Sequence, residues 1–258
     1  VLCQGGSVGA NNRAEGCDTA QELLMENIRL VRPTFFAATP AFWQSLAAEY
    51  EEERFRCAAS LGQGASQEAA REAALEQLRR RQVLGNRVRG LVTGGAPTEP
   101  SLRELLAAWF RVPVVDGYAS TETGTIAVDG VVPRRVSVLL LPLPGAEAPP
   151  GRAERGEICV HSATVCSGYL GDADGTSGHF VEKGGRRYFR TGDVGERCAD
   201  GTVAIVDRLS SAFKLAQGEF VYPDRLEAAL EARCPEVQQC HLWGRSTERF
   251  VVAVVVPT

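Results

Sequence analysis

Hydrophobic positions in the first part of the chain alternate between helical spacing and short apolar runs. Around residues 19–31, large apolar residues recur every three or four positions after a capping box that begins at Thr19, which predicts an amphipathic helix. The same reasoning predicts helices from Pro40 and over residues 66–82 and 101–110, with strands over residues 34–37, 88–93 and 112–115 between them. This alternation is typical of βαβ units.

From Val136 onward the pattern changes to short apolar runs separated by proline and glycine clusters. Strands are predicted over residues 157–160, 188–189 and 203–206, with a hairpin turn at 199–202. A βαββ pattern follows Arg208, over residues 213–215, 223–232, 240–243 and 250–256. The sequence therefore predicts an α/β fold with βαβ layers and a β-rich subdomain in residues 1–208, followed by the beginning of a small α+β domain in residues 209–258.

Composition narrows the classes of partner. The net charge of −4 offers no basic surface for nucleic acid, so small molecules or proteins are the expected partners. The longest apolar runs are much shorter than the roughly 20 residues of a membrane helix, which leaves only peripheral membrane contact. Eight cysteines and three histidines include no Cys-x-x-Cys pair, so free thiols and a cytoplasmic location are predicted rather than a zinc site or disulfides.

Residues 116–124 combine an aromatic ring, hydroxyl groups and a carboxylate just after a predicted strand. The ring of Tyr118 can stack on a base, and Ser120 and Thr121 can donate hydrogen bonds to phosphate oxygens. Glu122 can bind a hard cation through oxygen. This segment is therefore a candidate nucleotide site.

Two later segments add further candidates. Asp193 ends a predicted loop over residues 188–193, where its carboxylate could accept hydrogen bonds from the two ribose hydroxyls or could simply bond to the backbone of its own β-turn. Residues 206–220 contain Arg208, Lys214 and a glycine turn. They could equally form an ordinary linker in which both cations make surface ion pairs.

The three segments, in this order, resemble the adenylate-forming acyl ligase superfamily. The resemblance implies that Tyr118 stacks on adenine, Thr121 contacts the α-phosphate, Glu122 binds Mg²⁺, and Asp193 and Arg208 hold the ribose of ATP or AMP. It also implies nucleotide contacts for a wider set of residues: Gly95, Ala96 and Pro97 of a Gly-Gly-Ala-Pro turn, Asp116, Gly117, Ala119 and Ser120. For a later step, thioester formation, it implies a hinge at Ser210, and it places Lys214 and Gly218 in the segment that closes over the active site.

Within this superfamily, the segments 116–122 and 214–221 look most like carboxylic acid reductases, with long-chain fatty acyl-CoA synthetases close behind. The resemblance implies ATP-dependent activation of a carboxylic acid, most simply a fatty acid, as its acyl-adenylate. A thiol of CoA or of a phosphopantetheine arm would then accept the acyl group, and carrier and reductase domains would accompany a reductase. The alternative to an enzyme is a catalytically silent remnant that binds nucleotide.

Several departures from the family pattern shape these expectations. Ala119 replaces the usual glycine, which predicts a strained or shifted loop because alanine disfavours positive φ. The upstream phosphate loop and the terminal-domain lysine of the family have no counterpart, and the sequence begins at Val1, so an internal fragment is expected. Phe35, Phe36, Phe42 and Trp43 are expected in the core, with an acyl tunnel as the alternative.

Overall fold

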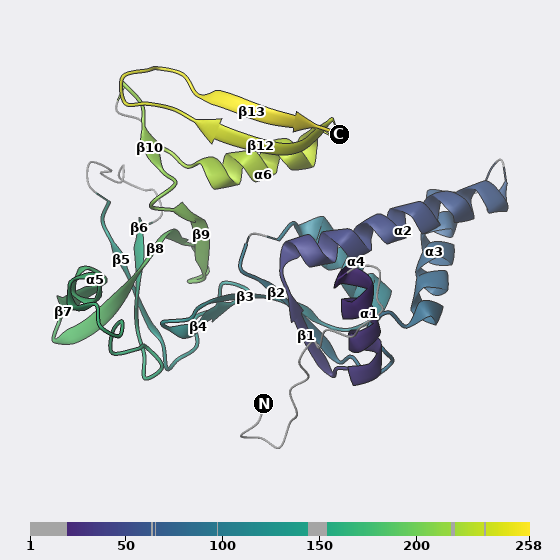
Figure 1. The fold of residues 1–258 in the computed structure, drawn as a ribbon, viewed down its shortest axis with the longest axis horizontal. Helices are drawn as coiled ribbons and strands as arrows, with labels where there is room; N and C mark the ends of the chain where they lie inside the picture. Colours follow the sequence, from purple (N-terminus) through teal and green to yellow (C-terminus); the bar gives the residue numbers. More distant parts are fainter. Residues whose placement is uncertain are drawn as a thin grey trace. The chain divides into compact units, whose positions relative to one another are not determined.

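A computed structural model describes residues 20–62, 64, 66–96, 98–143, 154–217, 220–234 and 236–258. The chain divides into two compact units, residues 1–117 and 118–258, and each is described by itself. An α/β fold was predicted, and both units mix helices with strands (Figure 1).

The first unit alternates helices with parallel strands, as the sequence predicts. Strands β1, β2 and β3 are neighbours in one sheet, and both pairings, β1 with β2 and β2 with β3, are parallel. The helices connect them in chain order. The elements are α1 (Ala20–Val31), β1 (Phe35–Ala38), α2 (Pro40–Leu61), α3 (Gln67–Arg81), β2 (Gly90–Gly94), α4 (Pro100–Phe110) and β3 (Val114–Ser120), the last of which continues into the second unit.

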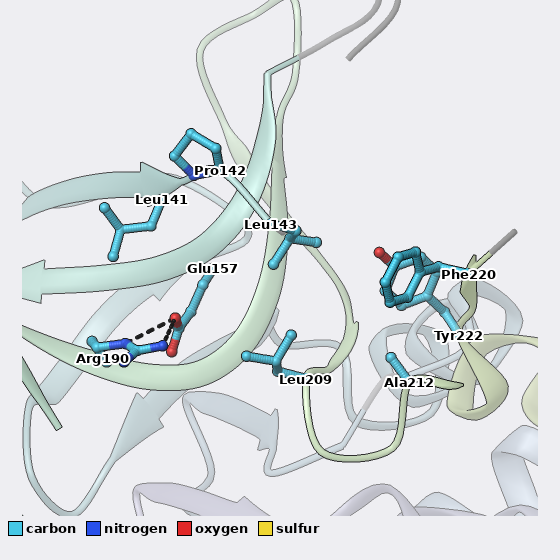
Figure 2. Close-up of a pocket in the computed structure, with 9 residues that line it drawn as sticks. All are labelled: Leu141, Pro142, Leu143, Glu157, Arg190, Leu209, Ala212, Phe220 and Tyr222. Carbon is cyan, nitrogen blue, oxygen red and sulfur yellow. Dashed lines mark hydrogen bonds and ion pairs between the residues drawn. The ribbon is translucent and has the colours of Figure 1, made fainter. Parts of the chain in front are cut away.

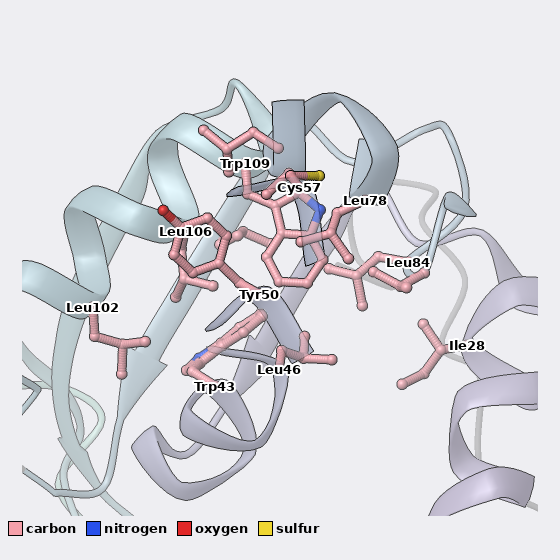
Figure 3. Packing of buried hydrophobic residues seen from close by; sticks show 14 residues of the cluster. Ile28, Trp43, Leu46, Tyr50, Cys57, Leu78, Leu84, Leu102, Leu106 and Trp109 are labelled. Atoms are coloured by element: carbon pink, nitrogen blue, oxygen red, sulfur yellow. The ribbon is translucent and has the colours of Figure 1, made fainter. Parts of the chain in front are cut away.

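The core of the first unit lies among its helices and the sheet (Figure 3). Trp43 and Trp109 are almost completely buried within it, and the Trp43 indole donates a hydrogen bond to the Ala38 carbonyl at 3.2 Å. Arg79 of α3 donates to the last carbonyl groups of α4, those of Ala108 and Trp109, which the helix itself leaves without partners. Phe36 packs against Trp43 as expected, whereas Phe35 is 69% exposed, so its predicted place in the core is wrong.

The second unit is dominated by antiparallel strands. Its five-stranded sheet has the order β5-β6-β8-β7, and β9 pairs with β8. The hairpin turn predicted at residues 199–202 does connect β8 to β9. The elements before the terminal module are β4 (Gly124–Val128), β5 (Ser137–Leu141), β6 (Arg155–His161), α5 (Ala173–Gly178), β7 (Phe180–Lys183), β8 (Arg186–Arg197) and β9 (Val203–Arg208).

The last part of the chain follows the predicted βαββ order with one added strand. It contains β10 (Phe213–Lys214), β11 (Phe220–Val221), α6 (Pro223–Arg233), β12 (Val237–Trp243) and β13 (Val252–Pro257). Strands β10 and β11 form one antiparallel pair and β12 and β13 another. We call residues 209–258 the terminal module. Its predicted boundary at Arg208 lies inside the second unit and stays a prediction.

Two segments predicted as loops, apart from the strand predicted at residues 188–189, are strands. Residues 116–120 continue β3, and residues 188–193 lie in the middle of β8. Glycine and aspartate are depleted in strands, but β3 pairs with β2 and β8 pairs with three other strands. Such pairing overrides local propensity. None of the described helices has the length and apolar character of a membrane span.

Candidate nucleotide site

Three residues predicted to hold adenosine meet in the second unit. The Tyr118 hydroxyl donates a hydrogen bond to Oδ2 of Asp193 at 2.6 Å. Nε of Arg208 lies 3.7 Å from Oδ1 of the same carboxylate, and the two residues face each other across the β8–β9 pair. The side chain of Asp193 is mostly buried, whereas that of Arg208 is 68% exposed. Asp193 is therefore the centre of a polar cluster, not the isolated turn residue of the alternative interpretation.

The backbone around Gly192 determines where the Asp193 carboxylate lies. Gly192 has φ of +74°, a left-handed conformation that costs glycine little, and no atom lies within 4 Å of the position that a Cβ would take. Thr191 donates its hydroxyl to the Ile158 carbonyl on β6, and the same oxygen accepts the Asp193 amide at 3.1 Å. The Leu209 amide donates to the Gly192 carbonyl at 2.7 Å. The Thr-Gly-Asp segment is thus fixed on both sides.

The phenol of Tyr118 remains protonated. Burial raises the pKa of Tyr118, and the charge and hydrogen bond of Asp193 raise it further because a phenolate would lie next to a carboxylate. Tyr118 is therefore a neutral donor to Asp193 at any pH near neutrality. This bond holds its ring beside Asp193, the residue predicted to bind the ribose.

The turn after β3 is held by hydrogen bonds to its backbone. The Thr123 amide donates to Oγ of Ser120 at 3.2 Å, and Thr164 donates its hydroxyl to the Thr123 carbonyl at 2.6 Å. The Cys166 amide donates to the Glu122 carbonyl at 2.7 Å. Thr121, which begins this turn, is exposed. The turn therefore presents Thr121 and Glu122 from a backbone that is anchored on both sides.

The carboxylate of Glu122 is ionised and lies among hydrogen-bond donors. The Tyr169 hydroxyl donates to Oε1 of Glu122 at 3.0 Å. The pKa of Glu122 is lowered, chiefly by its own backbone amide and also by the hydroxyls of Tyr169 and Ser120. Among the described residues, no three His, Cys, Asp or Glu side chains cluster as a ready-made metal site. One ionised carboxylate nevertheless suits Mg²⁺, which proteins usually bind through one or two carboxylates plus substrate phosphates.

Replacing Tyr169 by phenylalanine removes the hydroxyl that donates to Oε1 of Glu122 while keeping the ring beside His179. We expect the Mg²⁺ concentration for half-maximal activity of the full-length protein to change about 3- to 10-fold, with a smaller change in the maximal rate, because such supporting partners orient a metal ligand. A Mg²⁺ titration of nucleotide-dependent activity measures this. An unchanged titration curve would mean that Tyr169 does not orient Glu122.

The remaining residues predicted to contact nucleotide lie in the first unit, near the ends of its strands. Gly94 pairs with Gly117, and a Cβ at Gly94 would come within 2.5 Å of the Gly117 carbonyl oxygen, so only glycine fits there. Asp116 is half-buried and pairs with Thr93. Gly95 has φ of +87°, and both Gly95 and Ala96 are exposed. Pro97 lies outside the described residues.

Ala119 does not show the predicted strain. It is an exposed residue of β3, and the described residues other than glycine with positive φ are Arg32, Gln82, Arg111 and Asp129. An extended strand accommodates alanine without difficulty. The expectation of a strained loop was wrong because residues 116–120 are strand.

The residues expected to act in thioester formation lie in the terminal module. Lys214 in β10 is exposed and its ammonium lies 5.5 Å from the centre of the Phe220 ring. Within the described residues, no hydrogen bond or ion pair joins Lys214 to the Tyr118–Asp193–Arg208 cluster. Ser210 is exposed and lies in a turn, while Gly218 is outside the described residues.

A cavity of about 420 Å³ lies beside this segment (Figure 2). Leu143, Leu209 and Phe220 contribute apolar walls, and the ion pair of Glu157 with Arg190, 2.7 Å between Oε2 and Nη2, lies at one side. None of the residues predicted to bind nucleotide lines it. The cavity is therefore a feature of the junction with the terminal module rather than of the nucleotide candidates.

Residues 1–170 match the family described as AMP-binding enzyme. The chain belongs to the AMP-binding enzyme family. It is 32% identical to a carboxylic acid reductase of Mycobacterium marinum, over all of this chain and 21% of the reductase. It is 31% identical to fatty acyl-CoA synthetase A of Dictyostelium discoideum, over 91% of this chain and 38% of the synthetase.

A solved structure is also similar to this AMP-binding chain. The A domain of the carboxylic acid reductase from Segniliparus rugosus, in complex with AMP and a co-purified carboxylic acid, matches with a TM-score of 0.72 and 32% identity. The match covers 91% of this chain and 36% of the solved chain. The chain thus spans well under half the length of the relatives it matches, and both predicted subfamilies are among its relatives.

The structure adds residues that sequence reasoning missed. Tyr169 reaches Glu122 from 47 positions away, and Thr164 reaches Thr123 from 41 positions away. Neither lies in a segment whose pattern indicates nucleotide chemistry, and the two contacts depend on how residues 162–172 return to the turn after β3. No spacing rule in a single sequence could have found them.

Proposed function

We propose that the full-length protein activates a carboxylic acid with ATP, forming an acyl-adenylate and releasing pyrophosphate. The observation that supports this most directly is the cluster of Tyr118, Asp193 and Arg208 in one unit of an AMP-binding fold. The similar reductase domain that was solved with AMP and a carboxylic acid supports the same chemistry. ATP is thus the expected cosubstrate of the protein.

In this proposal each residue of the cluster has a distinct task. The Tyr118 ring stacks on adenine while its hydroxyl keeps the Asp193 carboxylate in place. Asp193 accepts hydrogen bonds from the ribose hydroxyls, and Arg208 balances its charge. Gly95, Ala96, Asp116 and Gly117, which belong to the first unit, are proposed as nucleotide-binding residues because the family resemblance implies it.

The chemical step requires positioning and charge stabilisation. A carboxylate oxygen of the acid attacks the α-phosphorus of ATP, a new P–O bond forms, and the bond to the β-phosphate breaks as pyrophosphate leaves. Thr121 donates to an α-phosphate oxygen, and the ionised Glu122 holds the cation. Mg²⁺, when bound there, would neutralise negative charge on the phosphates.

For the second step we propose transfer of the acyl group to a thiol. The thiol attacks the acyl carbonyl carbon, and AMP leaves with the electron pair of the acyl–phosphate bond. A phosphopantetheine arm, as in a carboxylic acid reductase, is favoured by the similarity to reductase domains, and CoA is the alternative. Lys214 is proposed to act in this step, after the terminal module turns about Ser210.

Carboxylate-dependent exchange of labelled pyrophosphate into ATP by the full-length protein tests the first step. Exchange that requires both Mg²⁺ and a fatty acid is the expected result. Absence of exchange across a series of aliphatic and aromatic acids would contradict the enzyme proposal and favour a silent nucleotide-binding protein. Supplying either CoA or a phosphopantetheinylated carrier protein to the preformed adenylate then distinguishes the two acceptors.

A further inference from the structure

The carboxylate of Asp207 is buried and contacts the backbone on both sides of the predicted hinge. Asp207 is only 4% exposed, although it is ionisable and lies next to the exposed Arg208 in β9. Its Oδ1 accepts the amide of Arg208 at 2.6 Å. Its Oδ2 accepts the amide of Asp224 at 3.1 Å, from a residue 17 positions later in the first turn of α6.

This second bond replaces a cap that α6 otherwise lacks. The first amides of a helix have no partner within the helix, and the residue at the N-cap, Tyr222, makes no side-chain hydrogen bond to them. Pro223 has no amide hydrogen, so the Asp224 amide is the first that needs an acceptor. A carboxylate at this end also interacts favourably with the helix dipole. Asp207 therefore caps α6 from outside the terminal module.

Apolar packing at the same junction is limited. Among the described residues, the cluster there has Leu143, Val194 and Val206 as its buried members, with Leu209 and Tyr222 partly buried against it. The guanidinium of Arg155 lies 5.0 Å from the centre of the Tyr222 ring. The hydrogen bond from the Asp224 amide to Asp207 adds a directional contact to this small apolar cluster.

We propose that Asp207 is a positioning residue that latches the terminal module in this orientation and must release the Asp224 amide when the module turns. Ser210 lies between the two bonded partners, so a rotation about it moves Asp224 but leaves Asp207 in β9. The inference rests on the proposed function, since the hinge at Ser210 belongs to it. The bond to Arg208 remains in both orientations and keeps that residue opposite Asp193.

The latch is sensitive to pH because its carboxyl is buried and a second carboxylate lies close to it. The pKa of Asp207 is raised to about 6, chiefly by burial and further by the carboxylate of Asp224, while the amides of Arg208 and Asp224 act in the opposite direction. The other ionisable groups at the junction are Tyr222 and Arg155, together with the Arg208–Asp193 pair. The carboxyl of Asp207 thus binds a proton more tightly in this orientation than it would after Asp224 has moved away.

The direction of the pH effect follows from this difference. The latched orientation is favoured at low pH, and this advantage is lost as the pH rises through about 6. At neutral pH the carboxylate is charged, and its bond to the module is the hydrogen bond that it accepts from the Asp224 amide.

The test compares the two half-reactions of the full-length protein between pH 5 and 8. Pyrophosphate exchange reports adenylation, and acyl transfer from the preformed adenylate reports the second step. For Asp207→Asn we expect the ratio of the two rates to change about 3- to 10-fold and its pH-dependent change near 6 to disappear. Asp224→Asn keeps the capped amide but removes the second carboxylate, so the midpoint should move to lower pH. An equal change in both rates with an unaltered pH profile would overturn the proposal.

The matched control is Asp200→Asn, which alters an exposed carboxylate bonded within the β8–β9 turn and should leave the ratio unchanged. Trypsin cleavage after Arg208 and Lys214 gives a readout that needs no activity. Several-fold faster cleavage in Asp207→Asn than in the control, with an unchanged circular dichroism spectrum, is expected. Equal cleavage rates would contradict the latch. If the wild-type protein shows no pyrophosphate exchange, the proposed function fails while the cleavage comparison still judges the latch.

Discussion

Replacing Glu122 by glutamine is expected to lower carboxylate-dependent pyrophosphate exchange by about 100-fold or more at limiting Mg²⁺. The substitution keeps the length of the side chain and leaves an oxygen that can accept from Tyr169, but it removes the negative charge. That charge is present at neutral pH because the pKa of Glu122 lies below its ordinary value. The rate measured against Mg²⁺ concentration checks the expectation.

Glu182→Gln is the matched control for this experiment, since Glu182 is an exposed carboxylate on β7. It should leave the Mg²⁺ dependence unchanged. If Glu122→Gln behaved in the same way as this control, Glu122 would not bind the cation. The stabilising contribution of ionised Glu122 to folding is complete above its ordinary pKa of 4.5 and is lost as the pH falls through its lower folded pKa. Near neutral pH this contribution is therefore fully present in the wild-type protein.

Replacing Asp193 by alanine is expected to weaken binding of ATP by roughly 1–3 kcal/mol, or about 5- to 150-fold. The substitution removes two acceptor oxygens proposed for the ribose, and it leaves the Tyr118 hydroxyl without its acceptor. The Arg208 guanidinium also loses its nearby carboxylate. Isothermal titration calorimetry with ATP on the full-length protein measures the difference.

Tyr118→Phe separates the two contributions in this prediction. It removes the hydroxyl that donates to Asp193 but keeps both the ring and the carboxylate, so the loss of affinity should be smaller than for Asp193→Ala. Equal losses would indicate that Asp193 acts mainly by placing Tyr118. Unchanged affinity in Asp193→Ala would return Asp193 to the role of a structural residue of β8.

The order of motifs in the sequence predicted the family and the members of the nucleotide cluster. Tyr118 and Asp193 are 75 residues apart, and the resemblance assigned them to adenine and to ribose; the structure joins them by a direct hydrogen bond that the resemblance did not state. Their roles toward nucleotide remain predictions. The match of residues 1–170 to the AMP-binding enzyme family confirms the resemblance itself.

What could not be predicted depends on pairing between distant strands. Residues 116–120 and 188–193 have the glycine and hydroxyl content of loops, but they lie in β3 and β8 because neighbouring strands satisfy their backbone groups. Strand β7 was missed for a similar reason, since it pairs with β8. Helix α5 was missed because the glycine-rich sequence over 173–178 has weak helix propensity. The partners Tyr169 and Asp207 depend on contacts between segments whose spacing has no recognisable period.

The pairing of Asp193 with Arg208 across β8 and β9 has a thermodynamic consequence. The side chain of Arg208 pairs with Asp193, the residue proposed to bind ribose, and its backbone amide donates to the Asp207 carboxylate. The same carboxylate accepts a hydrogen bond from the Asp224 amide in α6. If occupancy by nucleotide changes the free energy of that bond, then the position of α6 must change the affinity for nucleotide by the same factor. Measuring either effect would therefore give the magnitude of the other. The paired strands β8 and β9 would then couple ATP binding to the position of the terminal module.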